Sequence, residues 1–247
     1  MNTKLLIAAA ALLISSIANA AEIKVISTQA TEDAYKELVA QFEKATGHKV
    51  TTFYSGTINV SKKLADGELF DLVIMSAGAI DEQTAKGKVV PGSKVAFASS
   101  GTGLAVKKGA PKPDIGTADA LKKTLLGAKS IGYSTGPSGL YVVGMFDKMG
   151  IGNEVKPKLK QTPSGVFVGT LIANGEAEVG FQQISELVHF AGIDYVGPLP
   201  GDLQRMTMFS SGIHTAAKQP EEAKALVKFL TAPAAAPVIR KHGLEPG

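Results

Sequence analysis

Residues 95–106 read VAFASSGTGLAV, and the interpretation of the rest of the chain depends on this stretch. Its apolar residues predict a strand, but serine and glycine residues interrupt the strand and make it weakly polar. The stretch lies between two segments that each alternate strands with helices. We therefore interpret it as a connection that passes from one lobe to another, with Gly101-Thr102-Gly103 giving flexibility to a hinge.

The segment before this strand predicts one α/β unit. Hydrophobic periodicity indicates alternating elements at residues 23–27 (strand), 31–45 (helix), 49–53 (strand), 59–65 (helix) and 70–75 (strand). The segment after it repeats this order at residues 120–126 (helix), 130–133 (strand), 140–149 (helix) and 166–173 (helix). Such alternation is typical of parallel sheets flanked by helices.

The chain is then expected to return to the first unit. Residues 205–214 predict a return strand, and residues 220–230 predict an amphipathic helix with proline in its first turn. We expect lobe 1 to comprise residues 21–103 plus 209–247 and lobe 2 residues 104–208. Two crossing strands would leave a cleft that closes around a ligand. A single continuous α/β domain is the alternative.

The first twenty residues predict a signal peptide. Lys4 precedes an apolar run at residues 5–17, and Ala18-Asn19-Ala20 matches the small-x-small pattern of a cleavage site after Ala20. The run is shorter than the ~20 residues that span a bilayer. With no lipobox cysteine, the pattern predicts a free periplasmic protein.

Composition limits the possible partners. The formal net charge is only +4, and the arginines are Arg205 and Arg240 alone, so we do not expect nucleic acid as a partner. The chain contains no cysteine, which excludes disulfides, thiol nucleophiles and iron–sulfur clusters. We expect a monomer stabilised by its packed cores.

Motifs for catalysis are absent. The sequence has no P-loop, no Gly-x-Ser-x-Gly and no His-Glu-x-x-His, and we expect no metal and no cofactor. Glu186 and His189 lie one helical turn apart, but no second pair completes a metal site, so we interpret them as a structural or surface pair. A Ser-His-Asp triad stays open, since geometry rather than order defines it.

Four loops rich in small and hydroxyl residues follow predicted strands, at residues 27–31, 54–57, 76–78 and 133–139. Each precedes a predicted helix or short turn, where unpaired N–H groups can hold an anion. Any one of these loops is explained by ordinary helix capping. Four of them at the carboxyl ends of strands favour a ligand site.

Several segments carry a resemblance to a known family. They include GELFDLVIMS at residues 67–76, PSGLY at 137–141, GEAEVG at 175–180 and FLTAPAA at 229–235. In order and spacing they resemble the periplasmic molybdate-binding proteins and the wider type 2 extracytoplasmic solute-binding proteins. The resemblance implies an α/β, two-lobed, type 2 periplasmic-binding-protein-like fold with a hinged cleft between the domains.

The resemblance also implies a ligand site. Its matching positions and neighbouring loop residues are Gln29, Ser55, Thr57, Ser76, Ser138, Gly139, Val166 and Gln183. Gln29 and Gln183 stand where molybdate binders place a serine and a tyrosine. An amide offers both a donor and an acceptor, which suits a ligand with hydroxyl or protonated groups better than a bare tetrahedral dianion.

Two functions follow from the resemblance. The first is capture of a small anion, an oxyanion or a small carboxylate, for an inner-membrane ABC permease. The second is isomerisation, because the sequence also resembles periplasmic aconitate isomerases, which interconvert cis- and trans-aconitate by an allylic proton shift. The catalytic residues are unassigned, and loop position offers Tyr54, Tyr133, Tyr141 and His214 as candidates.

Overall fold

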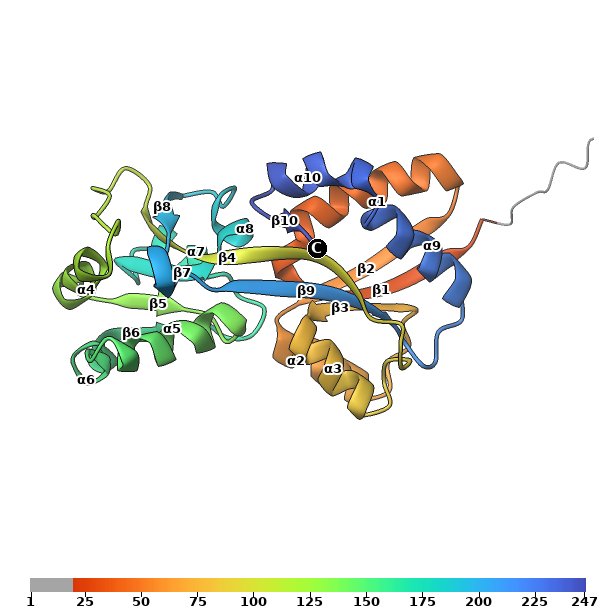
Figure 1. The fold of residues 1–247 in the computed structure, drawn as a ribbon, viewed down its shortest axis with the longest axis horizontal. Helices are drawn as coiled ribbons and strands as arrows, with labels where there is room; N and C mark the ends of the chain where they lie inside the picture. The colour runs from red at the N-terminus through yellow and green to blue at the C-terminus, as the bar shows by residue number, and fades with distance from the viewer. Residues whose placement is uncertain (1–19) are drawn as a thin grey trace, which may run out of the picture.

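The computed structural model describes residues 20–247. The predicted signal peptide therefore lies outside the described residues except for Ala20. Within residues 20–247, no helix has the length and hydropathy needed to cross a bilayer. Figure 1 shows two α/β bodies side by side, joined by long strands that run across the middle of the molecule.

The first body contains a mixed sheet. Strands β2, β1 and β3 are parallel, and β9 joins them antiparallel to β3. These strands, with β10 at the C-terminus, are β1 (Glu22–Thr28), β2 (Lys49–Ser55), β3 (Leu72–Ser76), β9 (Met206–Ile213) and β10 (Glu245–Pro246). The helices of this body are α1 (Glu32–Thr46), α2 (Thr57–Ala65), α3 (Ala77–Ala85), α9 (Pro220–Leu230) and α10 (Ala236–Lys241), with the short turns η1 (Gln29–Thr31) and η4 (Pro233–Ala235).

The second body repeats this design. Strand β5 pairs parallel with both β6 and β7. Its strands are β5 (Ile131–Tyr133), β6 (Leu159–Gln161), β7 (Val179–Gln183) and β8 (Ile193–Pro198). Its helices are α4 (Ala118–Gly127), α5 (Pro137–Lys148), α6 (Gly152–Val155), α7 (Val168–Ala173) and α8 (Ile184–Leu187), with the turns η2 (Lys156–Lys158) and η3 (Gly201–Leu203).

Strand β4 (Val95–Lys107) belongs to both bodies, as the opening stretch of sequence predicts. Its residues 95–101 pair with β9, whereas residues 102–106 pair with β7 and residues 103–107 with β8. Strand β9 returns antiparallel beside it. The division at residues 103/104 and 208/209 stays a prediction.

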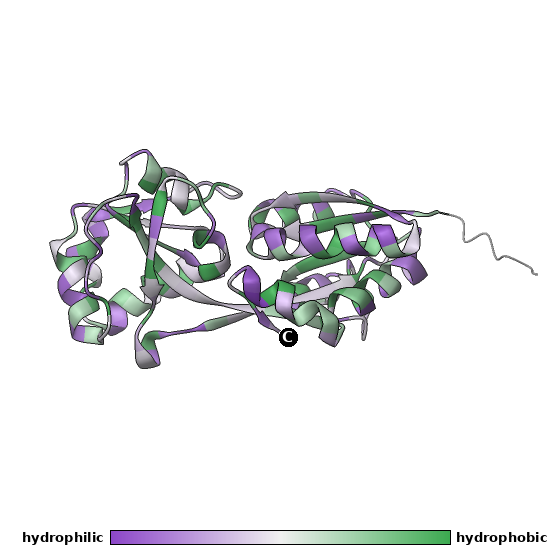
Figure 2. Ribbon diagram, turned by 90° about the horizontal axis from the view of Figure 1, so that it is seen from above, coloured by the Kyte–Doolittle hydropathy of each residue, from purple (hydrophilic) through white to green (hydrophobic). Residues whose placement is uncertain are grey.

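Each body buries its own apolar cores. Helices α1, α9 and α10 cover one face of the first sheet, and α2 and α3 cover the other. In the second body α4, α5 and α6 contribute to one core, and α7 and α8 to another. Figure 2 shows hydrophilic and hydrophobic residues alternating along the outer helices, as expected for helices with one buried face.

Several helix starts differ from the sequence expectation, and helix α4 begins at Ala118 instead of residue 120. Helix α2 begins at Thr57 instead of residue 59, and α5 begins at Pro137 instead of residue 140. Proline is favoured at the first helical position because its missing N–H would be unpaired there anyway. Helix α7 begins at Val168, two residues later than expected. Helix α3, which directly follows Ser76, had no prediction.

Asp71 ties the first body together. Its buried carboxylate accepts hydrogen bonds from the backbone N–H groups of Lys24 (2.8 Å), Lys218 (2.7 Å) and Gln219 (2.8 Å). The last two lie at the start of α9, so Asp71 links that helix to the sheet.

Asp71→Asn should lower the free energy of unfolding by about 2–3 kcal/mol, because the charge is lost and an amide nitrogen is turned toward buried N–H donors. Urea denaturation measures the change. Asp66→Asn is the control, since Asp66 forms an exposed ion pair with Lys62 that contributes at most ~1 kcal/mol. Equal effects of the two substitutions would contradict this account of Asp71.

Candidate functional site

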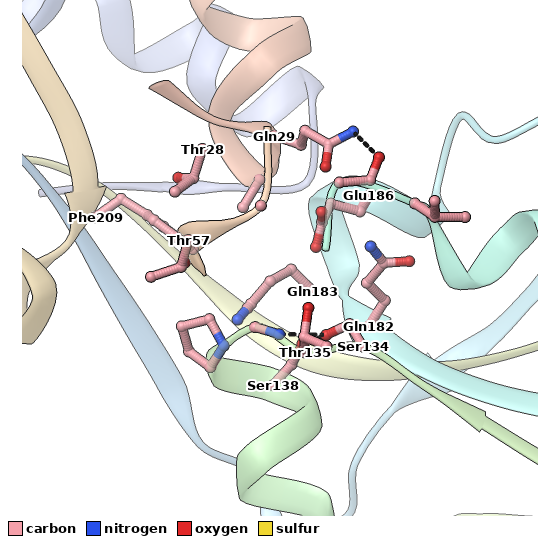
Figure 3. Close-up of a pocket in the computed structure, with 16 residues that line it drawn as sticks. Thr28, Gln29, Thr57, Ser134, Thr135, Ser138, Gln182, Gln183, Glu186 and Phe209 are labelled. Atoms are coloured by element: carbon pink, nitrogen blue, oxygen red, sulfur yellow. Dashed lines mark hydrogen bonds between the residues drawn. The ribbon is translucent and has the colours of Figure 1, made fainter. Parts of the chain in front are cut away.

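A partly open pocket lies between the two bodies. We call it the inner cavity. It is lined by Thr28, Gln29, Ala30, Gly56, Thr57, Ser134, Thr135, Gly136, Pro137, Ser138, Gly165, Val166, Gln182, Gln183, Glu186 and Phe209. Figure 3 shows that these side chains come from both bodies and from the crossing strand β9. Among these described residues there is no lysine and no arginine.

Two long helices start at the inner cavity. Helix α2 begins after Gly56 and helix α5 after Gly136, and neither has an acidic residue in its first turn. Their first N–H groups are unpaired within the helix and carry partial positive charge. The wall of the inner cavity therefore has positive character without a side-chain cation.

Hydroxyl and amide groups add further donors. The Thr28 hydroxyl is buried, lines the cavity and has no hydrogen-bond partner within the described residues. Gln182 accepts a hydrogen bond from the Val168 N–H (2.7 Å), and its side chain also hydrogen-bonds the Glu186 carboxyl. Since buried polar groups are normally hydrogen-bonded, the orphaned Thr28 hydroxyl indicates a place for a guest.

Contacts between the bodies border the inner cavity. Gln29 donates to the Gly165 carbonyl (3.2 Å), Asn59 to the Ser164 carbonyl (3.0 Å) and Ser185 to the Ala30 carbonyl (2.7 Å). A Cβ atom at Gly56 would lie only 2.5 Å from the Ser164 hydroxyl. The two bodies thus approach so closely that only glycine fits at position 56.

Glu186 is the only titratable side chain among the described residues that line the inner cavity. Figure 3 shows it on the wall between Gln29 and Gln182. Burial raises the pKa of its carboxyl from 4.5 to about 7, and the charge of Glu32 adds to this, whereas hydrogen bonding by Gln182 and the Gln183 backbone opposes it. Half of the Glu186 carboxyls are therefore protonated near neutral pH.

A second depression lies on the other side of Glu186. This acidic groove is lined by Glu32 and Asp33 of α1 together with Phe167, Ser185, His189, Phe190 and parts of Gln29 and Glu186. Glu186 therefore contributes to both the inner cavity and the acidic groove. The other charged or titratable groups that line the acidic groove are Glu32, Asp33 and His189.

An open outer cleft adjoins the inner cavity. The two share Thr57, Thr135, Gly136 and Pro137, and the outer cleft also includes Ser76 and Arg205. The Arg205 guanidinium lies over the ring of Tyr141, 5.4 Å from its centroid. A ligand larger than the inner cavity could extend toward this cation.

The structure brings most of the predicted site residues together. Gln29, Thr57, Ser138, Val166 and Gln183 line the inner cavity. Ser76 lines the adjoining outer cleft instead.

Two predicted residues lie behind the wall of the inner cavity. Ser55 is buried, and its hydroxyl accepts a hydrogen bond from Asn59 (3.0 Å). Gly139 is required for packing, since a Cβ atom there would overlap the Ser134 carbonyl.

Gln183 also contacts the crossing strands. Its amide is 3.0 Å from the Thr207 hydroxyl of β9. With the amide nitrogen turned toward β4, it donates to the carbonyls of Ser100 (3.1 Å) and Gly101 (3.3 Å), while the oxygen accepts from Thr207. Gln183 therefore connects the inner cavity to the hinge.

Sequence reasoning missed Glu186 as a site residue. The Glu186–His189 spacing was interpreted as a structural or surface pair, yet Glu186 lines the cavity and the His189 ring contacts the Lys241 carbonyl (3.2 Å). The available signal was its position three residues after Gln183, at the end of a buried strand. No group of three or more potential metal ligands occurs in residues 20–247.

The four catalytic candidates named from loop position lie outside the inner cavity. Tyr141 reaches the outer cleft, where its hydroxyl donates to the Leu203 carbonyl (2.7 Å). His214 is buried, and burial lowers its pKa. Burial raises the pKa of the Tyr54 hydroxyl.

Solved structures identify the class of this fold. The periplasmic molybdate-binding protein of Azotobacter vinelandii matches with a TM-score of 0.77 at 18% identity, covering 91% of this chain and 99% of that one. The sulfate-binding protein SubI of Mycobacterium tuberculosis matches with a TM-score of 0.75 at 19% identity, covering 92% and 87%. The chain therefore has the type 2 periplasmic-binding-protein fold.

The family follows from sequence comparison. The model of the bacterial extracellular solute-binding proteins matches residues 23–245, and the chain belongs to this family. An aconitate isomerase from Pseudomonas sp is 36% identical over 230 residues, covering 91% of this chain and 87% of the relative. The molybdate-binding protein ModA of Azotobacter vinelandii is 30% identical over 245 residues, covering 98% and 96%.

Glu186→Gln should stabilise the protein at pH 8 but not at pH 4. Folding raises the carboxyl pKa from 4.5 to about 7, so the folded protein binds this proton more tightly than the unfolded chain. The free energy of unfolding of the wild type is therefore highest below the unfolded pKa. It falls by at most about 3 kcal/mol as the pH rises through the folded pKa.

Thermal unfolding of both proteins between pH 4 and pH 8 measures this difference. Glu154→Gln, which changes an exposed carboxylate on α6, should leave the pH profile unchanged. A wild-type excess in stability at pH 8 would contradict the assignment.

Proposed function

We propose that this protein captures a small anion in the inner cavity and delivers it to an inner-membrane ABC permease. The observation that carries the proposal is a pocket between the bodies, walled by two helix N-termini and by hydroxyl and amide groups, with Glu186 as the titratable group and no side-chain cation among its described residues. Such neutral dipoles replace the water around an anion without requiring a full opposite charge. A relative named for molybdate binding supports the same assignment.

The proposed cycle follows from the paired crossing strands. Residues 21–103 plus 209–247 would form one lobe and residues 104–208 the other, with closure about β4 and β9. Export by the predicted signal peptide would place the mature protein in the periplasm, where we expect it to act as a monomer. The ligand class is an oxyanion or a small carboxylate.

Calorimetric titration with molybdate, tungstate, sulfate and small di- and tricarboxylates tests the proposal. At least one of these anions should bind, and Thr28→Val should weaken that binding about tenfold, since it removes a hydroxyl that lacks a partner in the structure.

Thr162→Val provides the matched control. The Thr162 hydroxyl is equally buried and unpartnered, but it does not line the inner cavity. Its removal should leave affinity unchanged. Absence of binding by all of these anions would overturn the proposal.

A second candidate function is isomerisation of aconitate in the same site. Two observations favour it: the aconitate isomerase relative, and a titratable carboxyl in a cavity that otherwise suits anions. Arg205 in the adjoining outer cleft could also receive a distal carboxylate of a tricarboxylate.

Incubation of the purified protein with trans-aconitate tests this candidate. Proton NMR should show the cis isomer appearing at a rate proportional to protein concentration, because the protein and not the buffer would supply the base. Tight binding of trans-aconitate without conversion would exclude isomerisation and leave capture as the function.

A further inference from the structure

Glu186 is an unexpected group in a cavity for anions. A carboxylate there would repel an anionic guest at close range in a low-dielectric site. A site for binding alone would be served better by an uncharged amide, such as that of the adjacent Gln182 or Gln183. The carboxyl therefore calls for a role other than attraction.

Glu186 and Gln29 both line the inner cavity and the acidic groove, and Glu186 is the titratable one of the two. Glu186 borders the inner cavity on one side and the acidic groove on the other, and Glu32, Asp33 and His189 also line that groove. A proton held on the carboxyl can thus be exchanged with a guest in the inner cavity or, through the groove, with solvent.

Resting on the second candidate function, we infer that Glu186 is the catalytic residue that moves the allylic proton of aconitate. As a carboxylate it takes a proton from the methylene carbon of the trans isomer, and the electrons of that C–H bond form a new double bond to the central carbon. The old double bond opens, and its outer carbon receives the proton from the carboxylic acid form of Glu186.

These two proton transfers balance without any co-reactant. One C–H bond breaks and another forms, no electron is gained or lost, and the carboxyl ends in its starting state. Between the two steps, negative charge spreads onto a substrate carboxylate. The N-termini of α2 and α5 and the Thr28 hydroxyl are placed to stabilise that charge.

The acidity of Glu186 suits this role. Burial raises its pKa to about 7, so both protonation states are populated near neutrality. General acid–base catalysis is most efficient when the pKa lies near the working pH. Since the carboxylate form starts the reaction, kcat/KM should fall about tenfold per pH unit below the pKa and level off above it.

The test measures conversion and hydrogen exchange in the same samples. Wild-type protein in D2O should convert trans- to cis-aconitate and introduce deuterium at the allylic carbon whenever Glu186 exchanges its proton with solvent before returning it. Glu186→Gln should lower conversion and exchange at least ~100-fold, while calorimetry shows trans-aconitate bound within a few-fold of wild type or more tightly. Glu154→Gln should match wild type in all three measurements.

Glu186→Asp keeps the carboxyl on a shorter side chain. Partial activity whose kcat/KM still falls at low pH therefore also supports the inference. Conversion by Glu186→Gln at the wild-type rate would overturn it, as would a wild type that binds trans-aconitate without conversion or exchange. Failure of the proposed function is a different result, in which none of the anions binds at all.

Discussion

The structure depends on one antiparallel pair, β4 with β9, because these strands carry the chain between the bodies in both directions. The pair does not continue as a regular ladder through the crossing. The pairing of β4 with β9 ends at Gly101. At Thr102 the Gln204 side chain takes over, since it accepts from the Thr102 N–H and donates to the Thr102 carbonyl at 3.0 Å each. A Cβ atom at Gly101 would lie 2.8 Å from that amide, so the glycine of the crossing strand is required for close approach as well as for flexibility. Gln183 holds the same crossing from the cavity side. Gln183 therefore links the wall of the inner cavity to both crossing strands.

In the proposed function, the inner cavity would hold an anion away from water by distributing the positive charge over helix N-termini. A buried lysine or arginine would cost several kcal/mol of desolvation before any ligand arrived. Helix N-termini are already part of the folded backbone and remain partly charged without such a cost. Glu186 is the exception. Burial raises its carboxyl pKa, so the free energy of unfolding falls as the pH rises through that pKa. Residues that reduce stability in a well-packed fold are concentrated at functional sites.

Much of this arrangement could be predicted from the sequence because it is local. Strand periodicity identified β4 and the returning strand β9, and hydroxyl-rich loops after strands predicted three of the segments that line the inner cavity. The remaining features depend on contacts between residues far apart in the chain. Glu186 enters the cavity wall because α8 packs against η1, where Ser185 bonds Ala30 across 155 positions. Gly139 was expected beside the ligand, yet its role is set by the Ser134 carbonyl, which only the folded turn places against it. Neither the Ser185–Ala30 contact nor the Gly139–Ser134 contact can be predicted from periodicity or from capping rules.

A binding protein and an isomerase on this scaffold would differ in very few groups. Closure, dehydration of the guest and stabilisation of its negative charge are needed for both, and in the proposed site backbone dipoles and hydroxyls would stabilise that charge. What proton transfer adds is one group whose protonation can change while the guest is held. In the described inner cavity that group is Glu186, with the acidic groove behind it as a route to solvent. Under these proposals the main chain would meet the requirements of capture, and a single side chain would decide between capture and chemistry.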